Sequence, residues 1–221
     1  MKNSCQLLNI FVSWQELTLT TIGTGDANSF RFGREVALSG DANTMAVGGH
    51  FADLRGATDA GLVRLYRRDG TDWNMFQQIN GPAVQGGYFG YTLDLSHDSS
   101  TLAVGAAFNS VYIYDYNNVT SVYDWFHTTA NFYIWEVRVS GDGSTFGVTS
   151  RDSVGARIFV RDAHGFQQRG DTITSYGSYD SGIALSYDGK IAAIGQRNWS
   201  SWTGRVGVFQ WRDANGNGSL L

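Results

Sequence analysis

The sequence predicts an all-β protein, a β-propeller of about four four-stranded blades in a single domain over residues 1–221. The first observation is a phrase that recurs four times in phase: an aromatic residue, two alternating apolar residues, Ser-x-Asp, and a run of small apolar residues. Its aspartates, Asp41, Asp98, Asp142 and Asp188, are spaced 57, 44 and 46 residues apart. A period of this size is typical of repeat architectures. The four predicted blades are residues 32–81, 89–130, 133–174 and 179–212.

The second observation is the strand pattern inside each copy, which is clearest in the first. Val36 and Leu38 alternate with other residues, as in a strand with one buried face. The Asp and Asn of residues 41–44 favour a turn because their side chains bond to nearby backbone groups, and Asp69-Gly70 favours a hairpin. Four antiparallel strands of this kind make one propeller blade. The other strands expected in the first copy are residues 45–49, 61–66 and 73–79.

The third observation is the phase of the repeat at the two ends of the sequence. The fourth copy has no outer strand, whereas residues 14–23 resemble the outer strand of the first copy, Trp73 to Gly81. We therefore expect residues 14–23 to be the outer strand of the last blade, because this closes the ring and covers two sheet edges. Residues 213–221 are predicted to be a tail. The alternative is a fragment of a larger propeller, and an open arc of that kind would self-associate edge to edge.

Two features of the repeat predict how the blades pack. Small residues stand in the second strand of each copy, and we expect them where the blades converge on the common axis. The aromatic residue nine positions before each aspartate is expected to wedge between neighbouring blades. The small residues are Ala46, Ala103, Gly147 and Ala193, and the aromatic residues are Phe32, Phe89, Tyr133 and Tyr179.

Composition excludes several classes of function. The net charge is −4, only 16% of residues are charged, and no basic cluster exists of the kind that nucleic-acid binding needs. No apolar run is long enough to cross a membrane. Cys5 is the single cysteine, so the chain cannot form an internal disulfide. The N-terminus lacks a continuous apolar region and a cleavage site, so no signal peptide is expected in it.

The phrase FGxxVALSGDxNTxAVG, followed by GxVxLYxxDGxxW and an IxG ending, resembles the FG-GAP propeller repeats related to the integrin α-subunit head. The resemblance spans about residues 14–212, and it weakens after Val104, where Ile134 and Asp180 replace Gly33 and Gly90. It implies a non-enzymatic module for adhesion or for binding a protein or glycan ligand, at the cell surface or outside the cell. The family's head has more blades than this chain can form.

A second resemblance is weaker. The SxDG turns at residues 140–143 and 186–189 are similar to the repeats of periplasmic TolB-like propellers. This likeness would imply a scaffold propeller of the periplasm. A third alternative is a fragment without an independent function.

Candidate ligand-binding residues are aromatic side chains in long connections, Trp199, Trp202, Tyr176 and Tyr179. Exposed aromatic loops on a propeller suit a protein or glycan contact, although the same residues would also serve to cap blade edges. A calcium site is suggested by Asp213, Asn215 and Asn217, whose alternate oxygen donors could converge on one hard cation. Asp53 and Asp59 are a weaker pair. The four repeat aspartates are expected to cap turns and not to bind metal.

No catalytic motif is present in the sequence. The four histidines have no metal-binding spacing, and neither a nucleophile elbow nor a phosphate-binding loop occurs. The chain is therefore expected not to be an enzyme. The alternative is a glycan-active or hydrolytic propeller enzyme with carboxylates at the central channel, which requires two carboxylates about 5–10 Å apart.

Overall fold

The computed structural model describes residues 31–107, 110–130, 133–150, 155–174, 182–196 and 203–212. Strands, turns and bends make up this part of the chain. It holds no helix, and so none long and apolar enough to cross a membrane. The predicted all-β class is confirmed.

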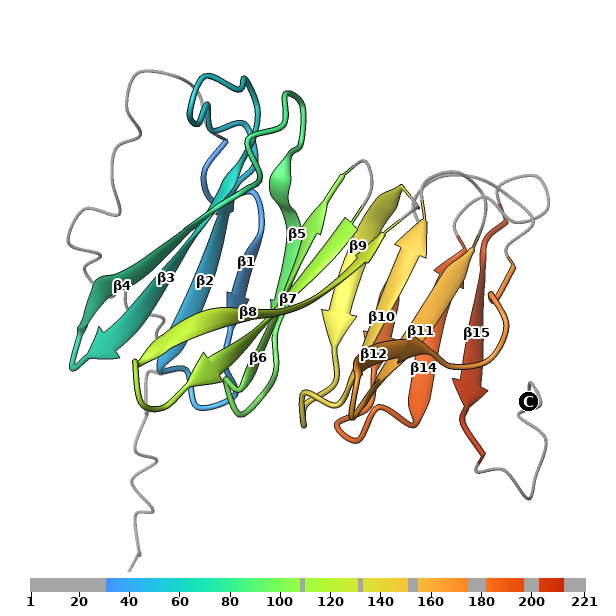
Figure 1. Ribbon diagram of the computed structural model, residues 1–221. Helices are drawn as coiled ribbons and strands as arrows, with labels where there is room; N and C mark the ends of the chain where they lie inside the picture. The colour runs from blue at the N-terminus through green and yellow to red at the C-terminus, as the bar shows by residue number, and fades with distance from the viewer. Residues whose placement is uncertain are drawn as a thin grey trace, which may run out of the picture.

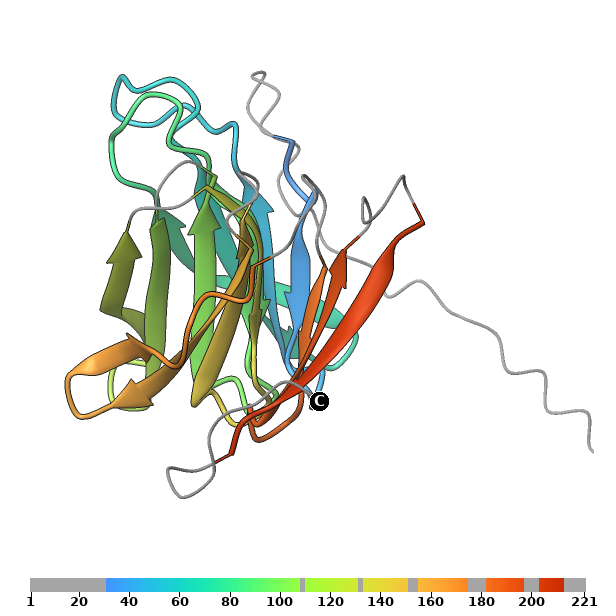
Figure 2. The same cartoon turned by 90° about the vertical axis from the view of Figure 1, so that its right-hand side faces the viewer.

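The strands form four antiparallel sheets in chain order. Three of the sheets have four strands, each paired with the next along the chain, and the fourth has three strands in its described part. Figure 1 shows the sheets side by side in a row, from the first at one end to the fourth at the other. In Figure 2 the connections between strands gather at the two ends of the sheets. The arrangement is compatible with the blades of a propeller.

The bounds of the strands follow the repeat. The first sheet is β1 (Val36–Leu38), β2 (Thr44–Gly49), β3 (Leu62–Asp69) and β4 (Asp72–Asn80). The second is β5 (Phe89–Leu95), β6 (Thr101–Ala106), β7 (Ser110–Asn117) and β8 (Val122–Ala130). The third is β9 (Ile134–Val139), β10 (Thr145–Ser150), β11 (Ala156–Asp162) and β12 (Gly165–Gln168), and the fourth is β13 (Ile183–Leu185), β14 (Ile191–Gln196) and β15 (Arg205–Gln210).

The turn between the first two strands of each sheet has one hydrogen-bond pattern, repeated four times. In the first sheet, the Ser39 hydroxyl donates to Asp41 Oδ1 at 2.6 Å, and the same oxygen accepts from the Asn43 N–H at 3.0 Å. The Ser39 hydroxyl in turn accepts from the Thr44 N–H at 3.0 Å. The bonds that Asp41 accepts from Ser39 and Asn43 lower its pKa. The equivalent bonds at Asp98, Asp142 and Asp188 confirm that the repeat aspartates cap turns.

The hydrophobic core lies between successive sheets. One cluster joins the first and second sheets through Leu65, Phe89 and Leu93, and another joins the second and third through Ile113 and Val137. A smaller one joins the third and fourth. Folding is therefore stabilised mainly by face-to-face burial between neighbouring sheets.

The small residues Ala46, Ala103 and Gly147 of the second strands face the following sheet. Their place relative to a common axis stays a prediction. A Cβ atom on Gly48 would overlap the carbonyl oxygen of Gly90, and one on Gly147 would overlap the side chain of Ile183. The smallness therefore lets the first strand of the next sheet pack closely.

The prediction for the aromatic residues is right for one of them. Phe89 is fully buried between the first and second sheets. Tyr133 is exposed, and Phe32 packs on a cluster made only of residues of its own sheet. Tyr179 lies outside the described residues. The wedge position is thus not a general feature of the repeat.

Candidate functional site

The first strands of three sheets bring four charged residues together. We call Glu35, Asp94, Glu136 and Arg138 the charged cluster. The two terminal nitrogens of Arg138 pair with carboxylates from different sheets: Nη1 lies 3.3 Å from Glu35 Oε1, and Nη2 lies 2.6 Å from Glu136 Oε1. One guanidinium therefore joins the first sheet to the third.

Two carboxylates of the charged cluster, those of Asp94 and Glu136, also accept hydrogen bonds from the backbone of the following sheet. Asp94 Oδ2 accepts from the Val139 N–H at 2.8 Å, and Glu136 Oε2 accepts from the Ile183 N–H at 3.1 Å. These N–H groups belong to the first strands β9 and β13. Each carboxylate thus fixes the position of the next sheet as well as carrying charge into the cluster.

Burial gives these carboxyl groups unusual protonation behaviour. Burial raises the pKa of Asp94 to about 6, although the Val139 N–H and Arg138 oppose it. Burial also raises the pKa of Glu136, again opposed by Arg138. Glu35 adds to both shifts by like-charge repulsion. Asp94 is therefore a carboxyl group that can hold or release a proton not far below neutral pH.

An aromatic layer lies beside the charged cluster, at the repeat position that precedes Glu35 and Glu136. Arg34, Tyr91 and Trp135 share one position of the repeat, seven residues before the aspartate. The Arg34 guanidinium carbon lies 4.1 Å from the centre of the Tyr91 ring, and that ring lies edge-on to Trp135 at 6.3 Å. Flat aromatic faces thus adjoin cationic and anionic groups, which is a usual composition for a ligand site.

His50 extends the aromatic layer toward the connection that follows β2. Its ring centre lies 5.6 Å from that of Tyr91 and 4.4 Å from that of Phe51. The side chain is buried, and Nδ1 has no hydrogen-bond partner within the described part of the chain. Burial, aided by the charges of Arg34 and Arg31, lowers the pKa of His50 to about 4. The imidazole is therefore neutral near pH 7.

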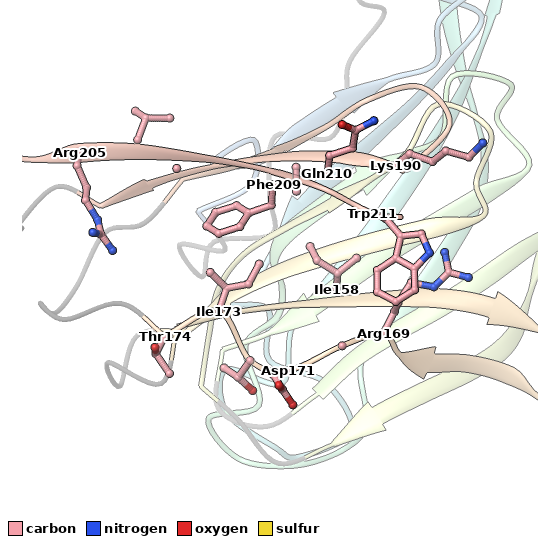
Figure 3. A pocket seen from close by; sticks show the side chains of 16 residues that line it. Ile158, Arg169, Asp171, Ile173, Thr174, Lys190, Arg205, Phe209, Gln210 and Trp211 are labelled. Atoms are coloured by element: carbon pink, nitrogen blue, oxygen red, sulfur yellow. The ribbon is translucent and has the colours of Figure 1, made fainter. Parts of the chain in front are cut away.

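A second concave region lies between the third and fourth sheets, shown in Figure 3. It is a groove of about 510 Å³. Ile158, Ile173 and Phe209 supply apolar walls, and the Arg169 guanidinium stacks on the ring of Trp211 at 4.5 Å. The groove runs along β15, the last strand of the fourth sheet as described.

The candidate residues of the sequence analysis fall largely outside the described residues. Asp53 and Asp59 are described, and there the Asp53 carboxylate accepts from the Asp59 N–H at 2.9 Å, which is a loop-ordering contact. Within the described ranges no group of three metal-ligating side chains comes together. The residues that lie outside are Tyr176, Tyr179, Trp199, Trp202, Asp213, Asn215 and Asn217.

Sequence reasoning missed the charged cluster. A usable signal was present, because Asp94 and Arg138 occupy a repeat position where the other two copies have Ala37 and Ala184. Charged residues at a position that is otherwise small, on the first strand of a blade, indicate a place where those strands meet. The alignment of the copies therefore marks Asp94 and Arg138 as unusual, but it does not show that Glu35 and Glu136 lie beside them.

The comparisons with known proteins concern the fold. No protein-family model matches the sequence, and no curated protein does. Solved structures are similar at low identity. A protein of unknown function from Desulfotomaculum acetoxidans is 15% identical with a TM-score of 0.60, over 84% of this chain and 54% of that one. Hydrazine synthase from Kuenenia stuttgartiensis is 16% identical with a TM-score of 0.57, over 86% and 48%.

A third similar structure is a Bacteroides fragilis protein provisionally named a 6-phosphogluconolactonase. It is 15% identical with a TM-score of 0.59, over 84% of this chain and 52% of that one. This chain therefore spans about half the length of these solved structures. The likeness shows the fold alone.

Proposed function

We propose that this chain is a non-enzymatic interaction module, of the FG-GAP type of propeller repeat, that binds a protein or glycan ligand along its first strands. The observation that carries the proposal is the convergence of the charged cluster and the aromatic layer from three sheets. A site assembled from several blades is positioned by the rigid packing between them.

A glycan suits this surface best. Tyr91 and Trp135 offer aromatic rings, and Arg34 offers several N–H donors in planar geometry. The carboxylate of Glu35 offers an acceptor to hydroxyl groups. This mixture of apolar faces and placed polar groups is the usual make-up of a site for a small polar ligand.

The test is binding to a panel of immobilised neutral and acidic glycans. We expect Trp135→Ala and Tyr91→Ala to weaken capture at least tenfold, because each removes an aromatic face. Trp125→Ala is the matched control, since Trp125 is an exposed tryptophan on β8, the outer strand of the second sheet. Equal losses in Trp125→Ala and Trp135→Ala, or no capture by the unaltered protein, would contradict the proposal.

The FG-GAP resemblance implies a location at the cell surface or outside the cell, and this location is part of the proposal. The proposal also includes a bound calcium ion that stabilises the chain. Asp213, Asn215 and Asn217 are the residues proposed for it. The check is the melting temperature with added calcium and with a chelator. A rise with calcium that Asp213→Asn abolishes would support the calcium part, and an unchanged melting temperature would remove it.

We also propose that residues 14–23 supply the outer strand of an incomplete blade. Ile22 precedes Phe32 by ten residues, the same spacing that separates Ile79 in β4 from Phe89 in β5. The groove along β15 is of the right kind to receive the strand, because its walls are partly apolar. Leu17 and Leu19 share one face of the expected strand. Leu19→Glu should therefore lower the free energy of unfolding, while Thr18→Glu, on the other face, should change it little.

A second candidate function is hydrolysis at the charged cluster. It is favoured by the pKa of Asp94, about 6, which suits a general acid, and by the name of the Bacteroides fragilis protein. Arg138 argues against it, because it already pairs with both Glu35 and Glu136. Hydrolysis of chromogenic glycosides or of 6-phosphogluconolactone, lost in Asp94→Asn, would replace the first proposal with this one.

A further inference from the structure

Every sheet of this repeat has two different faces. We call the face turned toward the preceding sheet the front face, and the face turned toward the following sheet the back face. On the front face of the second and third sheets, the residues five and three before the repeat aspartate are buried. They are Leu93 and Leu95 in β5, and Val137 and Val139 in β9.

On the front face of the first sheet, the residues at these two repeat positions are also apolar, but they are exposed to solvent. Val36 and Leu38 occupy these two repeat positions, and they are 51% and 52% exposed. Farther out on this face, Met45, Val47, Tyr66 and Trp73 are buried in a cluster of their own. The open part of the front face is therefore the strip along β1.

The back face of the fourth sheet is open in the corresponding way. In the first two sheets, the third-strand residues of the back face are fully buried: Val63 and Leu65 in β3, Val111 and Ile113 in β7. The strand pairing makes Val206 and Val208 their equivalents in β15, because Leu65, Ile113 and Val208 lie opposite Ala46, Ala103 and Ala193. Val206 and Val208 are 70% and 51% exposed.

The two open faces are thus two halves of one interface that the chain already forms internally between neighbouring sheets. Among the described residues, the first and fourth sheets do not cover each other, because they lie at opposite ends of the row in Figure 1. In two solved structures the match extends over 84% of this chain but over only 54% and 52% of the other chain. The row of four sheets therefore follows a path that can continue through about as many sheets again.

We propose that two copies of this chain join end to end, the back face of the fourth sheet of each against the front face of the first sheet of the other. A twofold axis makes both junctions identical, and both ends are used, so the assembly closes and does not grow further. The product is a ring of eight sheets, within the range known for propellers. This dimer does not depend on the proposed ligand.

The internal junctions show which residues would meet. A Cβ atom on Gly147 would lie within 3.1 Å of the Ile158 side chain and against that of Ile183, so these three residues adjoin across the junction of the third and fourth sheets. Their equivalents at the new junction are Ala193, Val208 and, from the second copy, Val36. Alanine in place of glycine adds one methyl group, and valine in place of each of the two isoleucines removes one, so the new contact is smaller by one methyl group and stays apolar.

The experiment is light scattering after size exclusion at micromolar concentration. The unaltered protein should elute with twice the 24.2 kDa mass of one chain. Val36→Lys and Val208→Glu should each be a folded monomer, since each places a charge in both junctions of a homodimer. Val119→Lys is the control, because Val119 is 93% exposed and lies in the turn between β7 and β8, on neither face. This variant should remain dimeric.

Mixing the two monomeric variants is the decisive step. In a mixed pair, one junction has no altered residue, and the other places lysine opposite glutamate. The mixture should therefore recover the dimer, which a merely misfolded variant could not do. A monomeric unaltered protein, open-ended growth, dimers in both single variants, or a mixture that stays monomeric would each overturn the proposal.

Discussion

Arg138 and Glu35 form an ion pair at 3.3 Å although they lie 103 residues apart in the sequence and belong to the third and first sheets. The second sheet lies between these two in the row. Contact across it means that the first strands of alternate sheets approach each other where the row curves. The charged cluster is therefore both a candidate binding surface and a tie that holds the curvature.

Arg138→Met should destabilise the protein by about 1 kcal/mol, the scale of a partly exposed ion pair. The change removes one cation from two carboxylates, and these then repel each other. The free energy of unfolding in urea is the measurement. Lys190→Met is the control, because it removes the pair with Asp188, which is exposed and 3.9 Å long. An equal loss in the two variants would show that the cluster has no special role.

Ser140→Ala should cost about 1–3 kcal/mol, because it leaves a buried N–H without an acceptor. The Ser140 hydroxyl accepts from the Thr145 N–H at 3.0 Å and donates to Asp142 at 2.6 Å. Ser186→Ala removes the same two bonds from an exposed turn, where water can replace them. We expect its cost to be less than half as large. Similar shifts of the urea midpoint would contradict this dependence on burial.

The strands were predictable from the sequence, whereas the site was not. Alternation at Val36 and Leu38 places two side chains on one face, and the structure has the strand at those residues. Alternation does not say which neighbour that face will contact, so the sequence does not predict that a small residue such as Gly147 lies against Ile183 of the next sheet. The charged cluster depends on three sheets, and only the packing between them brings Glu35 to Arg138.

The pH dependence of stability should contain a contribution from His50. Its pKa is about 4 in the folded protein and 6.5 in the unfolded chain. The unfolded chain therefore takes up a proton first, and the contribution to stability is lost as the pH falls from 6.5 toward 4. His50→Leu, similar in volume and without a titratable group, should lack this loss. Unfolding in urea at pH 7 and pH 4.5 measures it, and identical pH profiles would contradict it.

The titration of Asp94 should change the free energy of unfolding in the opposite direction to that of His50, over nearly the same pH range. Its pKa is about 6 in the folded protein against 3.8 in the unfolded chain, so the folded protein keeps the proton longer. The contribution of Asp94 to stability is fully present below pH 3.8 and is lost as the pH rises through 6. A shift of this size corresponds to about 3 kcal/mol.

Asp94→Asn should therefore be less stable than the unaltered protein at pH 4, because the amide cannot accept both backbone bonds. At pH 7 the difference should shrink or reverse, since only the unaltered protein then buries a charge. A constant difference between pH 4 and pH 7 would show that Asp94 titrates normally and would remove the basis for a general acid at this position.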